Sequence, residues 1–260
     1  MAFAMPRTIT DSIVVTKRNL IRMRRLPEAI FFNSVQPVMF VLLFRYVFGG
    51  AINTGGEYVN FLIPGILVQT SLFGGAGTAI GLNEDMGKGI IDRFRSLPMA
   101  RSAVLMGRIL ADVARNVFVV LLMLAVGTAV GFRFNNGFFP AIAAIAVLLL
   151  FGMAFSWLFA LVGLSVKTAE SAQIASFLPV FPLTFAASTF VPLDSMPGWL
   201  QVFARNQPVS HAVNAVRKLT QGSAVQGINL AAEVWLTLAW SGGITIVFAT
   251  LAIRKYRKVD

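Results

Sequence analysis

Long apolar segments separated by short polar ones dominate the chain. Six of these segments exceed 20 residues and contain few charged positions. A helix that crosses the roughly 30 Å hydrocarbon core needs about 20 mostly apolar residues, because it rises about 1.5 Å per residue. Backbone groups in lipid must satisfy one another, so apolar runs of this length form helices. The pattern predicts an all-α integral membrane protein with six transmembrane helices, at 29–49, 58–82, 106–131, 138–166, 171–191 and 232–253.

The composition fits a single membrane domain over residues 1–260. Hydrophobic residues make up 57% of the chain, charged residues 13%, and the mean hydropathy is +0.75. Soluble domains carry about 25% charged residues. We expect an amphipathic helix over 1–28, five spans over 29–191, an outer helical hairpin over 192–231, and the last span with a cytoplasmic tail over 232–260.

The positive charge lies mostly on one side of the predicted spans. Sixteen of the 22 Lys and Arg residues fall before the first span, between spans two and three, between spans four and five, or after the last span. Four fall on the opposite side, and Arg45 and Arg115 fall within spans. Cytoplasmic loops retain Lys and Arg, so both termini are expected in the cytoplasm. This placement favours a basic surface facing anionic lipid and argues against nucleic-acid binding.

The segment before the first span has helical periodicity. One narrow arc holds apolar residues, and the opposite arc holds Asp11, Arg18, Arg22 and Arg25. We expect an amphipathic helix in the inner interface, with its apolar face toward lipid and its arginines toward headgroups or a partner. A solvated basic tail is the alternative. The apolar arc consists of Ile9, Ile13, Thr16, Leu20 and Met23.

The loop between spans two and three shows the same amphipathic pattern. Its apolar residues share one helical face, whereas Lys88, Asp92 and Arg95 point away from that face. Asn83 suits a helix cap, and Pro98 would end the helix. The pattern predicts a short helix over 84–97 parallel to the membrane, which either anchors the loop in lipid or docks a protein. Its apolar face is formed by Met86, Ile90, Phe94 and Leu97.

The outer segment after span five predicts two short helices, at 199–205 and 209–221, broken by Asn206-Gln207-Pro208. Trp199 suits the headgroup interface. Pro179 and Pro182 predict a kink in span five itself. The glycine pairs of the two GxxxG patterns, at 77 and 81 and at 127 and 131, are expected to serve packing within the chain.

The sequence contains few of the residues that catalysis or metal binding requires. It has no cysteine, one histidine (His211, expected to be structural), and no G-x-x-x-x-G-K-[ST] loop that would bind ATP phosphates. Asp112 and Glu233 lie near span ends, which weakens a proton-coupled carrier. Arg45 and Arg115 are expected to reach toward an interface. The chain therefore lacks an energy source of its own.

The ordered motifs resemble those of type-2 permeases of ABC transporters, closest to the daunorubicin and doxorubicin drug-exporter branch. The resemblance is carried by Glu84-Asp-Met-Gly-Lys-Gly-Ile-Ile-Asp-Arg-Phe-Arg-Ser-Leu-Pro98 and Met106-Gly-Arg-Ile-Leu110. It is also carried on the outer side by Val191-Pro-Leu-Asp-Ser-Met-Pro-Gly-Trp-Leu200 and Asn206-Gln-Pro-Val-Ser210. It covers essentially the whole chain.

The resemblance implies a transport subunit without enzymatic activity, in a bacterial cytoplasmic (inner) membrane. Two copies would form a homodimer and pair with two ATPase subunits, which bind ATP and magnesium, while this chain carries neither cofactor nor metal. The residues facing the ATPase subunit would be Glu84, Asp85, Lys88, Gly89, Asp92, Arg93 and Arg95. The interface helix would contribute Arg18, Arg22 and Arg25, and an outer hairpin containing Pro192, Pro197, Trp199 and Pro208 would close the outer end.

Such a permease would export a hydrophobic drug, a lipid or a related compound. The 23 phenylalanines, against 3 tyrosines and 4 tryptophans, favour an apolar lining over a glycan path. A polysaccharide exporter permease of the same family remains an alternative. So do an ion- or proton-coupled carrier and a membrane scaffold or lipid-modifying enzyme.

Overall fold

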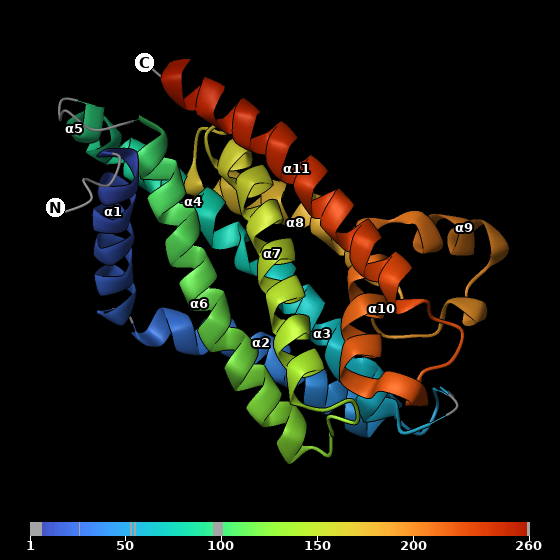
Figure 1. Cartoon of the computed structure of the whole chain (residues 1–260). Helices are drawn as coiled ribbons and strands as arrows, with labels where there is room; N and C mark the ends of the chain where they lie inside the picture. Colours follow the sequence, from blue (N-terminus) through green and yellow to red (C-terminus); the bar gives the residue numbers. More distant parts are fainter. Residues whose placement is uncertain (1–6, 26, 53, 55, 96–100, 259–260) are drawn as a thin grey trace, which may run out of the picture.

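The chain folds into a bundle of long helices (Figure 1). The computed structural model describes residues 7–25, 27–52, 54, 56–95 and 101–258, without the side chains at 7–9, 22, 24, 27–33, 92, 95, 101 and 258. Throughout these residues the regular elements are all helical. In chain order they are α1 (Arg7–Arg24), α2 (Pro27–Leu43), the π-helix η1 (Phe44–Phe48), α3 (Tyr58–Gly74), α4 (Ala76–Gly87), α5 (Ile90–Arg95), α6 (Arg101–Ala129), α7 (Phe138–Gly163), α8 (Ala169–Phe185), the 3-10 helix η2 (Leu193–Ser195), α9 (Gly198–Asn206), α10 (Pro208–Gln221), the 3-10 helix η3 (Gly222–Ala224) and α11 (Leu230–Lys258).

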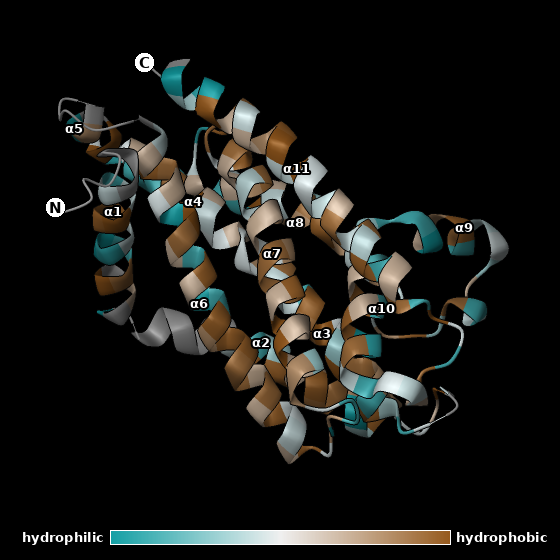
Figure 2. Ribbon diagram, viewed as in Figure 1, coloured by the Kyte–Doolittle hydropathy of each residue, from teal (hydrophilic) through white to brown (hydrophobic). Residues whose placement is uncertain are grey.

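Four helical segments of the described chain are long and apolar enough to cross a membrane: Tyr58–Gly87, Ser102–Ala129, Phe138–Gly163 and Leu230–Arg257. They match predicted spans two, three, four and six, and apolar residues dominate the middle of α6 and α7 (Figure 2). Predicted spans one and five correspond to shorter helices, α2 with η1 and α8. The structure thus shows an all-helical protein with four candidate spans, and the count of six stays a prediction.

The helix α8, which corresponds to predicted span five, ends before the apolar segment of 171–191 does. Pro179 and Pro182 lie inside α8, and the helix ends at Phe185. Proline removes one backbone donor and clashes with the preceding turn, so two prolines near the end favour an early stop. The Gln207 side chain donates to the carbonyls of Leu183 and Ala186 at this end, over 2.9 and 3.3 Å.

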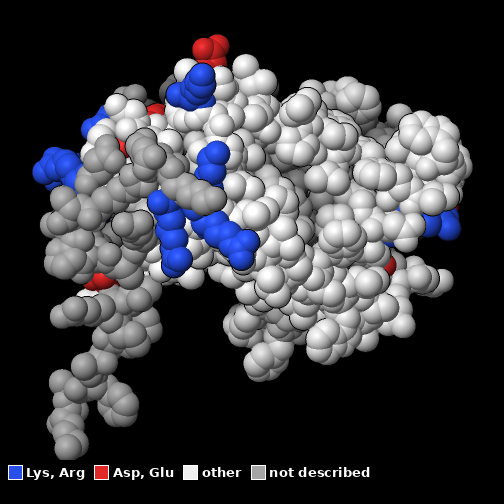
Figure 3. Space-filling view, turned by 90° about the horizontal axis from the view of Figure 1, so that it is seen from above, with Lys and Arg blue, Asp and Glu red and all other residues white. Residues whose placement is uncertain are grey.

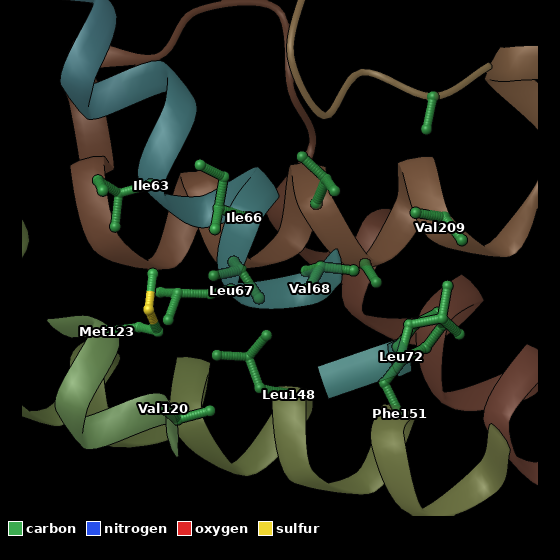
Figure 4. Close-up of a cluster of buried hydrophobic side chains, with 14 of the residues drawn as sticks. Ile63, Ile66, Leu67, Val68, Leu72, Val120, Met123, Leu148, Phe151 and Val209 are labelled. Atoms are coloured by element: carbon green, nitrogen blue, oxygen red, sulfur yellow. The ribbon is translucent and has the colours of Figure 1, made fainter. Parts of the chain in front are cut away.

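Helix α3 is the centre of the bundle. Twelve of its 17 residues are buried, which is expected of a helix that is apolar on all sides. Ile63 and Leu67 lie in one cluster with Met123 of α6 and Leu148 of α7, and Val209 of α10 closes the cluster from another side (Figure 4). Helix α3 therefore joins α6, α7 and α10 in one core, while α11 packs mainly on α7.

The predicted helix over 84–97 is divided differently in the structure. Residues 84–87 extend α4, the turn at Lys88 and Gly89 follows, and Ile90–Arg95 form α5, while residues 96–97 lie outside the described residues. Gly89 has a φ of +64°, which favours glycine and ends α4 with a sharp corner. Asn83 does not cap a helix. Its side chain donates instead to the carbonyl of Val166, 2.7 Å away.

The two ends of the bundle differ in charge. Helices α1 and α5 and the C-terminal end of α11 lie at one end, and the turns before α3 and after α6 lie at the other (Figure 1). Seen from above, Lys and Arg side chains gather over the half with α1, α5 and the end of α11, and few are visible over the other half (Figure 3).

Helix α1 runs beside α6. Its buried face consists of Ser12, Val15 and Asn19, and the Thr16 hydroxyl donates to the Gly107 carbonyl over 3.0 Å. Of the predicted lipid-facing arc, Ile13 is exposed whereas Thr16 contacts α6. Glycine at 107 permits this approach, because a Cβ there would lie 2.6 Å from the Val15 side chain.

Candidate functional site

A cavity of about 360 Å³ lies between α2, α3, α4, α6 and α8. This size is within the range of pockets that bind drug-sized molecules. Its lining has three chemical parts. The aromatic part is Phe40, Phe73 and Phe177, the amide part is Gln36, Gln69 and Gln173, and the charged part is Glu84, Arg108 and Arg115.

The charged part comes mainly from one face of α6. Arg108, Asp112 and Arg115 recur at intervals of four and three residues, so they lie on the same side of the helix. Asp112 is 5% exposed; its carboxylate accepts from the Thr78 hydroxyl and lies 3.2 Å from Arg115 Nη2. Arg115 Nη2 also donates to the Gly74 carbonyl. This carboxylate is therefore held by a cation and a hydroxyl group.

A second group of charges joins three elements near the corner between α4 and α5. Arg108 Nη1 lies 3.3 Å from Asp85 Oδ2, and Arg108 Nη2 donates to the Gly77 carbonyl over 3.1 Å. Arg18 Nη2 lies 3.9 Å from Asp85 Oδ1. The Arg18 guanidinium also lies over the Phe94 ring, 5.0 Å from its centroid. Arg18 thus links α1 to both α4 and α5.

Glycines on α4 make room for the arginines of α6. A Cβ at Gly77 would lie 2.6 Å from Arg115 Nη1, and one at Gly81 would overlap the Arg108 guanidinium. Each arginine head therefore occupies the space of a missing side chain. The first of the two GxxxG patterns serves packing within the chain, as expected. In the second, a Cβ at Gly127 would lie 3.2 Å from the Ile63 side chain.

The predicted ATPase-facing residues divide into surface and interior positions. Glu84 is partly buried, Lys88 and Arg93 are exposed, and Lys88 Nζ lies 3.5 Å from Glu84 Oε2. Asp85 lies in the interior, 5% exposed, because it faces α1 and α6. Arg25 is exposed. The side chains of Arg22, Asp92 and Arg95 lie outside the described residues.

Sequence reasoning missed the role of Arg115. We expected its side chain to reach an interface, whereas it hydrogen bonds inside the bundle to Gly74 and pairs with Asp112. The signal was present in the spacing of Arg108, Asp112 and Arg115 on one helical face. The matching glycines lie on another helix, and periodicity within one span does not show them.

The predicted outer hairpin consists of α9 and α10. Pro197 and Trp199 are exposed at the start of α9, Pro192 precedes η2, and Pro208 is the first residue of α10. Helix α10 is almost wholly buried among α3, α7 and α11. A polar cavity of about 870 Å³ lies beside it. Helix α10 is therefore an integral part of the bundle, whereas most of α9 lies at its surface.

Arg217 of α10 ties the hairpin to two other segments. It is 4% exposed and donates to the carbonyl of Phe61 over 3.0 and 3.2 Å and to that of Ser188 over 2.7 Å. Its guanidinium also lies 3.6 Å from the centroid of the Phe61 ring. Burial lowers the pKa of Arg217 to about 9, which leaves it protonated at neutral pH.

His211 has a structural role, because it helps to join two helices. Its Nδ1 lies 2.7 Å from Glu233 Oε2, and Asn214 donates to Glu233 Oε1 over 3.1 Å, so α10 is joined to α11. Over the described residues, no three His, Cys, Asp or Glu side chains gather as a metal site would require.

Known proteins resemble this chain over most of its length. Residues 10–220 match the family described as ABC-2 type transporter. The chain belongs to the ABC-2 type transporter family. It is 36% identical over 241 residues to the daunorubicin resistance ABC transporter permease DrrB1 of Streptomyces coeruleorubidus, covering 92% of this chain and 83% of that one. It is 30% identical over 255 residues to the probable doxorubicin resistance ABC transporter permease DrrC of Mycobacterium tuberculosis, covering 97% and 90%. A putative transport permease, ycf38 of Cyanophora paradoxa, is 25% identical over 221 residues, covering 83% and 76%.

The Arg217 contacts predict a measurable loss of stability in this ABC-2 protein. Replacing Arg217 with Met retains much of the side-chain volume but leaves the carbonyls of Phe61 and Ser188 without these donors. Buried unsatisfied groups cost about 1–3 kcal/mol each. We expect Arg217→Met to lower thermal stability in detergent, measured by size-exclusion chromatography after heating. Arg205→Met on α9 is the control, because Arg205 is exposed and exposed ion pairs contribute little. Equal stability of the two variants would contradict the assignment.

Proposed function

We propose that this chain is the membrane subunit of an ATP-driven exporter, which moves a hydrophobic drug, lipid or related compound out across the bacterial cytoplasmic membrane. The observation that carries the proposal is the family match together with the drug-resistance names of the relatives. The cavity adds support, because its phenylalanines suit an apolar compound better than a glycan. ATP and magnesium would bind to a separate ATPase subunit, so this chain has no enzymatic activity and no cofactor of its own.

The proposed topology has six spans, with α2 and η1 as the first and α8 as the fifth. Both termini then lie in the cytoplasm, and α9 and α10 form an outer re-entrant hairpin. The unequal placement of Lys and Arg between the two sides of the predicted spans supports this orientation. In this topology residues 29–191, 192–231 and 232–260 keep the roles that the sequence predicts for them, and 1–28 hold the interface helix.

Two copies of the chain and two ATPase subunits would form the complete exporter. The corner between α4 and α5 suits contact with the ATPase, because Lys88 and Arg93 are exposed there beside Gly89. A homodimer is supported by exposed apolar residues on two of the five helices that border the cavity. These are Met39, Leu42 and Leu43 on α2, and Ile174, Leu178 and Phe181 on α8. A second copy against these rows would complete the cavity wall.

Reconstitution tests the exporter directly. The permease is co-purified with its ABC ATPase and placed in proteoliposomes. Doxorubicin or daunorubicin, the compounds for which its relatives are named, is added with ATP outside the vesicles, where the outward-facing ATPase subunits would drive its uptake. We expect transport with ATP and none with ADP, and no ATP hydrolysis by the permease alone. Transport driven by a pH gradient without any ATPase would instead support the proton-coupled carrier.

Cysteine labelling tests the topology, because the natural chain has no cysteine. Gly198 and Lys255 are both exposed, one before the outer hairpin and one near the C-terminus. In intact cells an impermeant maleimide should label Gly198→Cys and leave Lys255→Cys unlabelled until the cells are opened. The reverse pattern would invert the orientation.

The turn at Gly89 predicts that a substitution there weakens the coupling between the ATPase and transport. A non-glycine residue with positive φ costs about 1–2 kcal/mol, so Gly89→Ala should distort the turn between α4 and α5. We expect this variant to bind the ATPase while ATP-driven transport falls several-fold. Gly87→Ala is the matched control, since it lies in α4 and a Cβ there meets nothing within 4 Å. Normal transport by Gly89→Ala would show that the turn between α4 and α5 does not transmit ATP-driven motion.

A further inference from the structure

Among the described residues that line the cavity between α2, α3, α4, α6 and α8, Glu84 is the one acidic side chain. We propose that Glu84 binds the ammonium end of amine-bearing aromatic compounds, and that this ammonium group takes the place of Lys88, with which Glu84 is paired. This inference rests on the proposed function, because it names the residue that recognises one end of the exported compound.

Glu84 lies at one end of the cavity. Gly77, Gly81 and Glu84 recur at intervals of four and three residues, so they lie on one face of α4, and all three line the cavity. Glu84 is the last of them along the helix, about 10 Å from Gly77 at a rise of about 1.5 Å per residue. Its side chain is partly buried, with 35% of its surface exposed. A compound that lies along α4 therefore reaches this carboxylate with one end.

The two arginines of the cavity lining are each paired with a carboxylate. Arg108 Nη1 lies 3.3 Å from Asp85 Oδ2, and Arg115 Nη2 lies 3.2 Å from Asp112 Oδ1. Both pairs are largely buried, and opposite charges at this distance offset one another strongly where water is scarce. A cation at Glu84 therefore faces a carboxylate, while the charge of the neighbouring Arg108 is balanced by Asp85.

The pair between Glu84 and Lys88 is suited to exchange. Lys88 Nζ lies 3.5 Å from Glu84 Oε2, one helical turn away, and 59% of the Lys88 side chain is exposed. Exposed pairs of this kind contribute little, because water solvates both ions and a long side chain must be ordered. A ligand ammonium group that the cavity already holds through its ring system loses less freedom when it meets the carboxylate. It can therefore replace the Lys88 ammonium group.

Phenylalanines supply the surface for an aromatic ring system. Phe73 and Phe177 lie with their ring centroids 5.3 Å apart, and Phe40 lines the same cavity from α2. Such rings favour offset or edge contacts with a flat aromatic ligand. The cavity thus combines aromatic side chains with a carboxylate at one end, which matches a flat aromatic compound that carries an amine. Doxorubicin and daunorubicin, for which the relatives are named, belong to this class.

Daunorubicin and N-acetyldaunorubicin test the inference, because they share one ring system and one sugar and differ in the charge at the amine. Binding is measured by the fluorescence anisotropy of each compound at pH 7 on the permease–ATPase complex in phosphatidylcholine nanodiscs, with protein-free nanodiscs subtracted. We expect daunorubicin to bind at least tenfold more tightly than its acetylated form, because acetylation removes the charge-assisted hydrogen bond to Glu84.

Two variants assign the preference to Glu84 and to the exchange with Lys88. Glu84→Gln keeps the size of the side chain and removes its charge, so the preference for daunorubicin should fall below about threefold, with little change for the acetylated form. Lys88→Gln removes the competing ammonium group, so daunorubicin should bind about two- to fivefold more tightly, as expected for the loss of an exposed pair. Glu170→Gln is the control and should keep the natural preference, because Glu170 is exposed at the start of α8 and does not line the cavity.

The outcomes separate this inference from the proposed function. Equal binding of the two compounds by the natural protein, no binding of either, an unchanged preference in Glu84→Gln, or no gain in Lys88→Gln would overturn it. If Glu84→Gln does not assemble with the ATPase, the natural protein and Lys88→Gln still decide the question. ATP-dependent uptake of daunorubicin by the natural complex in proteoliposomes is measured in parallel. If uptake persists when the binding results contradict the inference, the exporter stands and only the role of Glu84 is wrong; if uptake is absent, the proposed function fails with it.

Discussion

Charged side chains inside a membrane bundle require partners, and this constraint determines how α6 packs against α3 and α4. Arg108, Asp112 and Arg115 lie on one face of α6. An unpaired charge at such a site would be strongly unfavourable. Here Asp85 and Asp112 supply the opposite charges, and the carbonyls of Gly74 and Gly77 accept further hydrogen bonds from the arginines. The glycines allow this arrangement, because any larger residue at 77 or 81 would collide with the guanidinium groups.

The same contacts connect the corner between α4 and α5 to the cavity. Arg108 lines the cavity and pairs with Asp85, and Asp85 in turn lies near Arg18 of α1. Arg18 contacts Phe94 of α5 as well. These contacts therefore link α5 and α1 to the cavity wall. Asp85 was predicted to face a partner subunit, and its interior position instead suits an internal link between these elements.

The sequence was most informative for features that depend on the residues of a single helix. Apolar length located the helices that became α6, α7 and α11, and turn residues such as Pro208 located α10. The division of the predicted helix over 84–97 was not predictable. The corner depends on the backbone at Gly89, and the Asn83 side chain donates to the carbonyl of Val166 instead of capping a helix. The shortness of α8 was only partly predictable. Its prolines were visible, but the capping of its last turn by Gln207 depends on the position of α10.

The two ends of the bundle are held by contacts of different strength. Beside α1, Arg18 is 36% exposed and lies 3.9 Å from Asp85, and an ion pair of this kind contributes at most about 1 kcal/mol. At the other end, Arg217 is buried and joins α10 to backbone carbonyls of two separate segments. Separating these buried groups leaves the guanidinium and two carbonyls unsatisfied, at about 1–3 kcal/mol each. In the proposed exporter, motion that starts at the corner of α4 and α5 therefore meets little resistance near α1, while the outer hairpin stays fixed to α3. The cavity can thus change shape from its cytoplasmic side before the outer end opens.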